Sequence, residues 1–257
     1  RRADALDGLG KGSLPPYAAG VGDGWKGIGP AFKQRFLEFD GEGVELDDQA
    51  VASWIHSNRE ALEDADKAPE DAASTDSPDL PSTVSPPLLC GALLQSLQRS
   101  LFSSPAFARL LHALTDIPLV ARRGSARRFR PGLDYTVAHY GVLTQDPQLD
   151  AVLCVVDDAG AAEAEAWASG EVGGYEAYLL ADEEEKEKGA ADVYRAGDED
   201  ESGVLNVSPA CNTLSLVLRD EGLMRFVKFV SARAPGSRWD LSMVYEPEPD
   251  SDSDEEA

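Results

Sequence analysis

Hydrophobic and polar residues alternate with a period of two over most of the chain after Thr115. In the segment NTLSLVLRDEGLMRFVKFVSARAPGSRWDLSMVYE, residues 212–246, Leu214, Leu216 and Leu218 alternate with Ser215, Val217 and Arg219, and Leu241, Met243 and Tyr245 repeat the pattern. This alternation is typical of strands with one buried face. Turn residues divide the region into candidate strands at 117–123, 126–130, 134–140, 149–156, 174–180, 203–208, 212–219, 224–231 and 238–246.

Before Thr115 the apolar residues recur at close to 3.6 positions, which predicts helices. One helix begins at Pro86 or Pro87 and runs through LLCGALLQSLQRSLF, and the next begins at Ser104-Pro105. An earlier helix is predicted to begin at a cap formed by Asp47 or Asp48 and to run to about Asp66. The segment 24–41, GWKGIGPAFKQRFLEFDG, is interpreted as an entry to the domain that contributes packing residues.

Helices followed by many short strands predict a mainly β fold with flanking helices. We expect a β-sandwich or jelly roll with the N-terminal helices packed on one sheet. The predicted domain covers residues 24–246 after a flexible segment, or the end of an upstream linker, at 1–23. Residues 67–86 and 182–202 are predicted to be disordered acidic insertions, and 247–257 a disordered acidic tail.

The charge of the chain limits its partners. The formal net charge is −24 over 257 residues, and most of the acids lie in 60–79, 182–201 and the tail SDSDEEA. This acidity disfavours direct contact with a nucleic-acid backbone and favours a basic protein partner or solubility alone. No apolar run reaches the roughly 18 residues that a membrane helix needs. The three cysteines, without a CxxC motif, are predicted to be reduced and buried, as in a cytosolic or nuclear protein.

Four segments carry a family resemblance: RRFRPGLDYTVAHYG at 127–141, GGYEAYLL at 173–180, VSPACNTLSLVLRD at 207–220 and RFVKFVS at 225–231. They resemble the C-terminal, non-catalytic domain of the Fe(II)- and 2-oxoglutarate-dependent ribosomal prolyl 3-hydroxylases, in its fungal type. The resemblance implies a degenerate double-stranded β-helix, a cupin-like jelly roll.

The resemblance also implies a role. The parent protein would hydroxylate a proline of a small-subunit ribosomal protein, with Fe(II), 2-oxoglutarate and ascorbate in its catalytic domain and links to translation and oxygen sensing. This domain would support the upstream catalytic domain and bind a protein, such as a basic ribosomal or nuclear regulatory one. It would need no cofactor of its own, contact neither nucleic acid nor membrane, and be cytoplasmic and nuclear.

Catalytic domains of this superfamily hold iron through His-x-Asp and a later His. His139 lies on the matching strand, but Gly141 stands where the Asp would be. The later His falls within Phe226, Val227 and Lys228, none of which is a ligand for a cation. We therefore expect no catalytic residue and no metal ligand set. His112, four residues before Asp116 on one helical face, is interpreted as a packing residue.

Two residues are candidates for a degenerate pocket, His139 and Arg238. Arg238 stands where the catalytic domains carry the arginine that binds the far carboxylate of 2-oxoglutarate. The alternative is that Arg238 begins a strand and pairs with a local carboxylate such as Asp240 or Glu221. Likewise, the basic run Arg122, Arg123, Arg127, Arg128 and Arg130 could contact an acidic partner or the acidic residues of the chain itself.

Two other functions stay open at the level of sequence. One is an active 2-oxoglutarate dioxygenase with an atypical metal site built from His139 and a carboxylate such as Asp134. The other is a β-sandwich adaptor unrelated to oxygenases.

Overall fold

Two antiparallel β-sheets form most of the molecule. The computed structural model describes residues 3–4, 7–9, 15–41, 53, 56, 85–138, 144, 146–180 and 203–248. A seven-stranded sheet has the order β1-β2-β3-β10-β5-β8, with β4 paired to β2, and a three-stranded sheet has the order β7-β6-β9. The strands are β1 Trp25–Ile28, β2 Gln34–Phe39, β3 Leu119–Phe129, β4 Tyr135–Thr136, β5 Gln148–Val155, β6 Glu176–Leu180, β7 Gly203–Val207, β8 Thr213–Arg219, β9 Leu223–Val227 and β10 Arg238–Pro247.

Helices α3 (Pro86–Leu97) and α4 (Pro105–Thr115) begin in the same way. Each follows a serine whose hydroxyl accepts a hydrogen bond from the first turn: Leu88 N donates to Ser85 Oγ at 3.3 Å and Phe107 N to Ser104 Oγ at 3.1 Å. Serine caps with proline at the first helical position are local signals. A short π-helical segment, η1 (Gln98–Phe102), continues α3, and the short α5 (Ala161–Ala168) follows β5.

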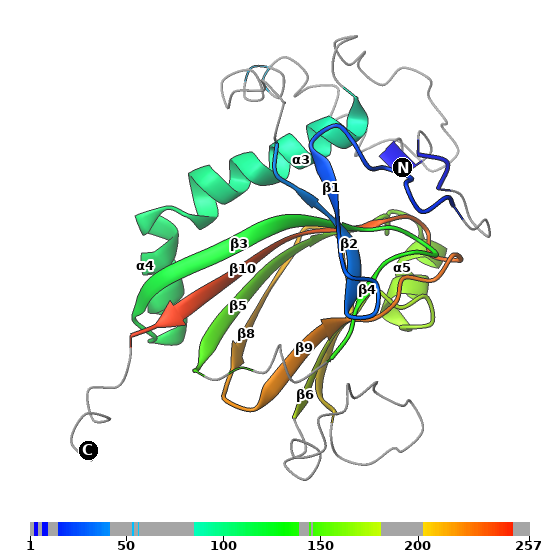
Figure 1. Cartoon of the computed structure of the whole chain (residues 1–257). Helices are drawn as coiled ribbons and strands as arrows, with labels where there is room; N and C mark the ends of the chain where they lie inside the picture. Colours follow the sequence, from blue (N-terminus) through cyan, green and yellow to red (C-terminus); the bar gives the residue numbers. More distant parts are fainter. Residues whose placement is uncertain are drawn as a thin grey trace.

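Helices α3 and α4 cover one face of the larger sheet (Figure 1). Strand β10 sends Trp239, Leu241, Met243 and Tyr245 into this layer, where they join Leu94, Phe102, Phe107 and Leu111 in one apolar core. Hydrogen bonds also tie the helical layer to the strands. Trp25 Nε1 donates to the Pro87 carbonyl at 2.8 Å, and Tyr245 Oη donates to the Phe102 carbonyl at 2.7 Å.

The opposite face of the larger sheet turns toward the three-stranded sheet (Figure 1). Because side chains alternate along a strand, β10 sends Arg238, Asp240 and Ser242 to this side. A second apolar cluster, with Phe36, Phe129 and Trp167 among its members, packs at one end of the space between the sheets. The remainder of that space holds charged side chains.

The mainly β architecture with a few flanking helices agrees with the sequence prediction. Candidate strands 117–123 and 126–130 are a single strand, β3, and β1, β2 and α5 were not predicted as elements. His112 and Asp116 are both exposed, so the packing interpretation is wrong. The predicted helix of 48–66 and the acidic segments lie almost wholly outside the described residues. No helix in the described part of the chain is long and apolar enough to cross a membrane.

The start of the chain contacts the sheet. Asp4, within the segment predicted to be flexible, is buried, and its Oδ1 accepts a hydrogen bond from Arg128 Nη2 at 2.8 Å. Ser237 N donates to Asp4 Oδ2 at 2.8 Å, and Asp7 also pairs with Arg128. These contacts attach Asp4 and Asp7 to β3, and Asp4 also to the residue that precedes β10. The limits of the domain stay a prediction.

Candidate functional site

A cluster of buried charges fills the space between the two sheets, and Glu176 of β6 lies at its centre. Its Oε1 accepts hydrogen bonds from Arg225 Nη2 at 2.7 Å, Arg238 Nη2 at 2.8 Å and Arg127 Nη2 at 3.3 Å. Glu176 is 2% exposed, so all three contacts are made away from bulk water. One carboxylate thus joins strands β3, β9 and β10 to β6.

Two more carboxylates complete this ionic cluster. Asp240 of β10 accepts a two-point contact from Arg127, with Nε to Oδ1 at 2.7 Å and Nη2 to Oδ2 at 3.0 Å. Asp150 of β5 accepts from Arg219 Nε at 3.0 Å and lies 3.4 Å from Arg225 Nη1. Paired contacts of this kind fix the orientation of a guanidinium group as well as its charge.

The cluster holds four guanidinium groups, from Arg127, Arg219, Arg225 and Arg238, against three carboxylates. Burial raises the pKa of Glu176, but the charges of Arg225, Arg238 and Arg127 together lower it by more. The pKa therefore lies well below its ordinary value of 4.5. Burial lowers the pKa of Arg238 by less than Asp240 and Glu176 raise it, so that pKa is raised above its ordinary value. These groups stay ionised because each charge faces an opposite one.

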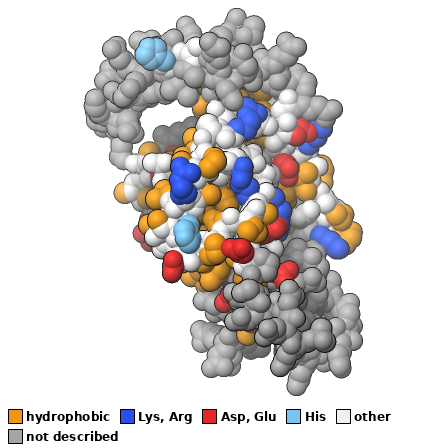
Figure 2. Space-filling view, turned by 90° about the vertical axis from the view of Figure 1, so that its left-hand side faces the viewer, with side chains coloured by type: hydrophobic (Ala, Val, Ile, Leu, Met, Phe, Trp, Pro, Cys, Tyr) orange, Lys and Arg blue, Asp and Glu red, His pale blue; other side chains and the backbone are white. Residues whose placement is uncertain are grey.

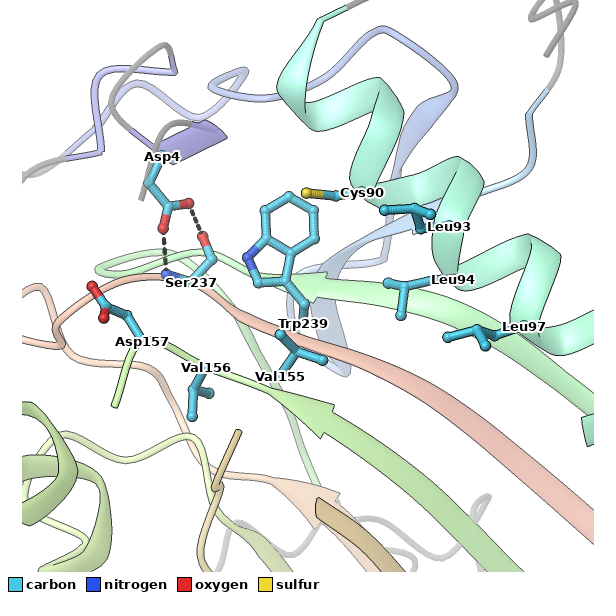
Figure 3. Close-up of a pocket in the computed structure, with 10 residues that line it drawn as sticks. All are labelled: Asp4, Cys90, Leu93, Leu94, Leu97, Val155, Val156, Asp157, Ser237 and Trp239. Carbon is cyan, nitrogen blue, oxygen red and sulfur yellow. Dashed lines mark hydrogen bonds between the residues drawn. The ribbon is translucent and has the colours of Figure 1, made fainter. Parts of the chain in front are cut away.

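A cavity lies on the other face of the seven-stranded sheet, between α3 and the strands β5 and β10. Its volume is about 500 Å³. Figure 3 shows leucines of α3, among them Leu93 and Leu97, on one side and Val155 and Trp239 on the other. Cys90 contributes a thiol group to the lining, and burial raises the pKa of that thiol. This lining suits an apolar group and gives no activated nucleophile.

Sequence comparison identifies the family. The family described as "Oxoglutarate and iron-dependent oxygenase degradation C-term" matches residues 9–254, nearly the whole chain. The chain belongs to this family.

Two curated relatives are prolyl hydroxylases by name. The chain is 37% identical over 155 residues to "Prolyl 3,4-dihydroxylase OGFOD1" of Ostreococcus tauri, covering 60% of this chain and 29% of that protein. It is 30% identical over 157 residues to "Prolyl 3-hydroxylase sudestada1" of Drosophila melanogaster, covering 56% of this chain and 26% of that protein. The matched part is therefore less than a third of either relative.

The described residues do not fit the iron that the family name implies. Phe226 and Val227 lie on β9 and offer no donor atom to a metal, and Lys228 follows them with a positive charge. The space between the sheets holds more guanidinium groups than carboxylates, which disfavours a divalent cation there. Within the described residues no group of three His, Cys, Asp or Glu side chains could hold a metal ion. His139 lies outside the described residues.

Asp134, the carboxylate considered as a partner of His139, is engaged elsewhere. It is fully buried and makes a two-point contact with Arg130, with Nε to Oδ2 at 2.7 Å and Nη2 to Oδ1 at 2.9 Å. Arg35 Nε lies 3.5 Å from the same carboxylate. Two guanidinium groups therefore compete with any cation for Asp134.

Arg238 pairs with Asp240, as one of the two interpretations of the sequence proposed. Its Nη2 lies 2.9 Å from Asp240 Oδ2, and its Nη1 donates to the Gly174 carbonyl. Glu176 is a further partner of Arg238 that the sequence did not indicate. Among the contacts of the described residues, Arg238 makes none with Glu221. Arg238 Nε is buried and has no acceptor among the described residues. The cavity of about 10 Å³ that Arg238 lines has room for at most one water.

The basic run of β3 contacts the chain's own acids. Arg127, Arg128 and Arg130 pair with Asp240, Asp4 and Asp134. Arg123 pairs with Glu246 at the surface, where such a contact adds little stability.

Sequence reasoning missed Glu176, Asp150, Arg219 and Arg225 as members of one site. Glu176, Asp150 and Arg225 each stand between two apolar residues, as Glu176 does in GGYEAYLL, and Arg219 follows the apolar Leu218. A charge placed on the buried face of an alternating strand is a detectable signal, because it needs a partner there. Which residue is that partner depends on the pairing of distant strands.

Proposed function

We propose that this chain is a non-catalytic domain of a prolyl hydroxylase, serving structural support and protein binding. The observation that carries the proposal is the ionic cluster around Glu176. The space between the two sheets, where a catalytic double-stranded β-helix would bind its metal, is occupied by paired arginines and carboxylates. The family membership supports this assignment over an unrelated adaptor, and the two facing sheets suit a degenerate double-stranded β-helix.

For the parent protein we propose the reaction that the resemblance implies, hydroxylation of a proline in a small-subunit ribosomal protein. Fe(II), 2-oxoglutarate and ascorbate would then serve an upstream catalytic domain, in the cytoplasm and the nucleus. The names of the two relatives support prolyl hydroxylation.

Metal binding tests whether this chain is itself an oxygenase. Mn(II) is titrated calorimetrically into the chain with and without 2-oxoglutarate, and the His139→Ala variant is titrated in parallel. We expect that 2-oxoglutarate does not strengthen Mn(II) binding. We also expect the parent chain and the His139→Ala variant to give identical titration curves. Tight binding that needs both 2-oxoglutarate and His139 would instead establish the active dioxygenase.

The face of α4 is the protein-binding surface that we propose for the upstream domain. Leu110 and Leu114 of α4 are 50% and 65% exposed, and Leu101 and Val120 beside it are also exposed. Figure 2 shows hydrophobic side chains on this side of the molecule, with basic ones between them. Exposed apolar side chains gathered on one helix face are characteristic of protein contacts.

Association in trans tests this surface. The upstream part of the parent protein and this chain are expressed separately and mixed. Leu114→Asp should abolish their association, whereas Phe32→Asp, which changes a side chain 75% exposed in the loop between β1 and β2, should leave it unchanged. Equal binding by both variants would place the interface elsewhere.

A further inference from the structure

A cavity of about 160 Å³ opens at the edge of the ionic cluster, between β2, β4 and β9. Its lining includes three cationic side chains, Lys33, Arg127 and Arg225, and no carboxylate among the described residues. On a chain with a formal net charge of −24 this is an uncommon environment. The volume is roughly ten times what a single water needs, so the cavity can take a small molecule.

Both arginines keep N–H groups that the ionic cluster does not use. Arg127 donates through Nε and Nη2 to Asp240 and Glu176, and its Nη1 has no acceptor within the described part of the chain. Arg225 uses Nη2 for Glu176 and Ser242, and its Nε has no described acceptor. Their side chains are 11% and 10% exposed, and neither unused nitrogen is among the fully buried unpaired atoms. Both arginines line the cavity, and these N–H groups are not fully buried.

The walls of the cavity are held in place by backbone contacts. Gln34 of β2 pairs with Thr136 of β4, and Val137 N donates to the Lys33 carbonyl at 2.9 Å. Val227 N donates to Thr136 Oγ1 at 2.7 Å, which leaves the hydroxyl proton of Thr136 for another acceptor. A site whose donors are fixed beforehand loses less entropy on binding.

The charge around the cavity favours an anion. The ionic cluster has one guanidinium group more than it has carboxylates, and Lys33 adds a further positive charge. Glu38, opposite Arg127 in the β2–β3 pair, is a further nearby acid, but like Glu176 and Asp240 it does not line the cavity. Phe36 and Val227, which belong to the same apolar cluster, supply apolar walls, which suit methylene groups better than a bare inorganic ion.

We propose that this cavity binds a small aliphatic carboxylate without a metal. Its carboxylate would accept from Arg127, Arg225 and Thr136, its carbon chain would lie against Phe36 and Val227, and Lys33 would attract it at the rim. The inference is independent of the proposed function, because it needs neither iron nor an upstream domain.

Calorimetric titration with glutarate tests the site, in Tris–chloride buffer freed of metals over a chelating resin. We expect binding of one molecule per chain, which weakens as chloride is added because the contacts are ionic. Inorganic phosphate is titrated as the second probe and should bind more weakly. Absence of glutarate binding, or phosphate binding at least as tightly, would overturn the proposal.

Two lysine variants with the same charge change locate the bound acid. Lys33→Gln should weaken glutarate binding about threefold, the size expected for an exposed charge. Lys26→Gln removes an equal charge from β1, where Lys26 pairs with Asp40, and should leave the affinity unchanged. If the two variants weaken binding equally, the effect is general charge and not this cavity.

Amide shifts in the unmodified chain give a readout that depends on no variant. Glutarate should shift the amide resonances of Val137 and Val227 in the walls, and leave that of Leu88 at the start of α3 in place. Shifts confined to residues outside the cavity would contradict the assignment.

Discussion

At the residue scale, Glu176 illustrates what a buried charge does in this protein. The free-energy cost of removing a carboxylate and three guanidinium groups from water offsets much of the attraction between them. Such clusters therefore contribute little net stability. Their geometry is nevertheless restrictive, because each unpaired charge would be expensive. We infer that the ionic cluster chiefly fixes how the two sheets face each other.

Glu176→Gln tests this inference. The substitution keeps the shape but leaves Arg225, Arg238 and Arg127 facing a neutral amide, so we expect a loss of about 3–5 kcal/mol in the free energy of unfolding. Urea unfolding monitored by tryptophan fluorescence measures it. The control is Glu165→Gln on the exposed side of α5, which should stay within about 0.5 kcal/mol of the parent. Equal stabilities would show that the charge on Glu176 is dispensable.

At the element scale, the turn before β6 sets how the three-stranded sheet joins the rest. Gly173 and Gly174 both have left-handed backbone angles, with φ of 71° and 74°. Gly174 N donates to the Lys228 carbonyl at 3.0 Å, and Ser231 N donates to the Val172 carbonyl at 2.8 Å. The turn therefore lies against the segment that follows β9, so close that a side chain has no room.

Gly173→Ala should expose this close approach. The added Cβ would lie 1.9 Å from the carbonyl oxygen of Phe229, and the left-handed angle adds strain of about 1–2 kcal/mol. We expect a total loss of at least about 3 kcal/mol in urea unfolding. Gly170→Ala is the matched control, since its φ is also left-handed at 75° but its nearest neighbour would lie at 3.8 Å. It should lose only the strain, and similar losses in both variants would exclude the clash.

At the scale of the whole molecule, the ionic cluster couples folding to pH. The pKa of Glu176 in the folded protein lies below its ordinary value of 4.5. A depressed pKa contributes stability that is present above the ordinary value and is lost as the pH falls below it. Protonation of the many surface acids acts in the opposite sense, because it reduces the repulsion of a strongly negative chain.

The difference between two proteins isolates the contribution of Glu176. We expect the free energy of unfolding to fall more steeply between pH 5 and about pH 3 in the parent chain than in Glu176→Gln, because only the parent must protonate this carboxylate. Urea unfolding at several pH values measures both slopes. Parallel pH profiles would mean that Glu176 titrates alike in the folded and unfolded states.

The sequence by itself determined the elements whose signals are local. Serine followed by proline starts α3 and α4, and alternation with a period of two marks β8 and β10, because caps and side-chain direction depend on neighbours along the chain. Strands β1 and β2 and helix α5 were missed because each is short and has a weak period. The family segments also sufficed to identify the family.

Only the tertiary structure decided the site. Arg127 and Asp240 are 113 residues apart, and their contact exists because β3 and β10 pair at that register. Arg238 could be assigned either to a ligand or to a local acid, and Glu176 from β6 added a partner that no local pattern indicates. The cavity beside Arg225 likewise needs β2, β4 and β9 together. Alternation specifies which residues share a face of a strand, whereas strand pairing decides which face is buried and which residues meet: in β8 Leu214 and Leu218 are exposed and Arg219 is buried.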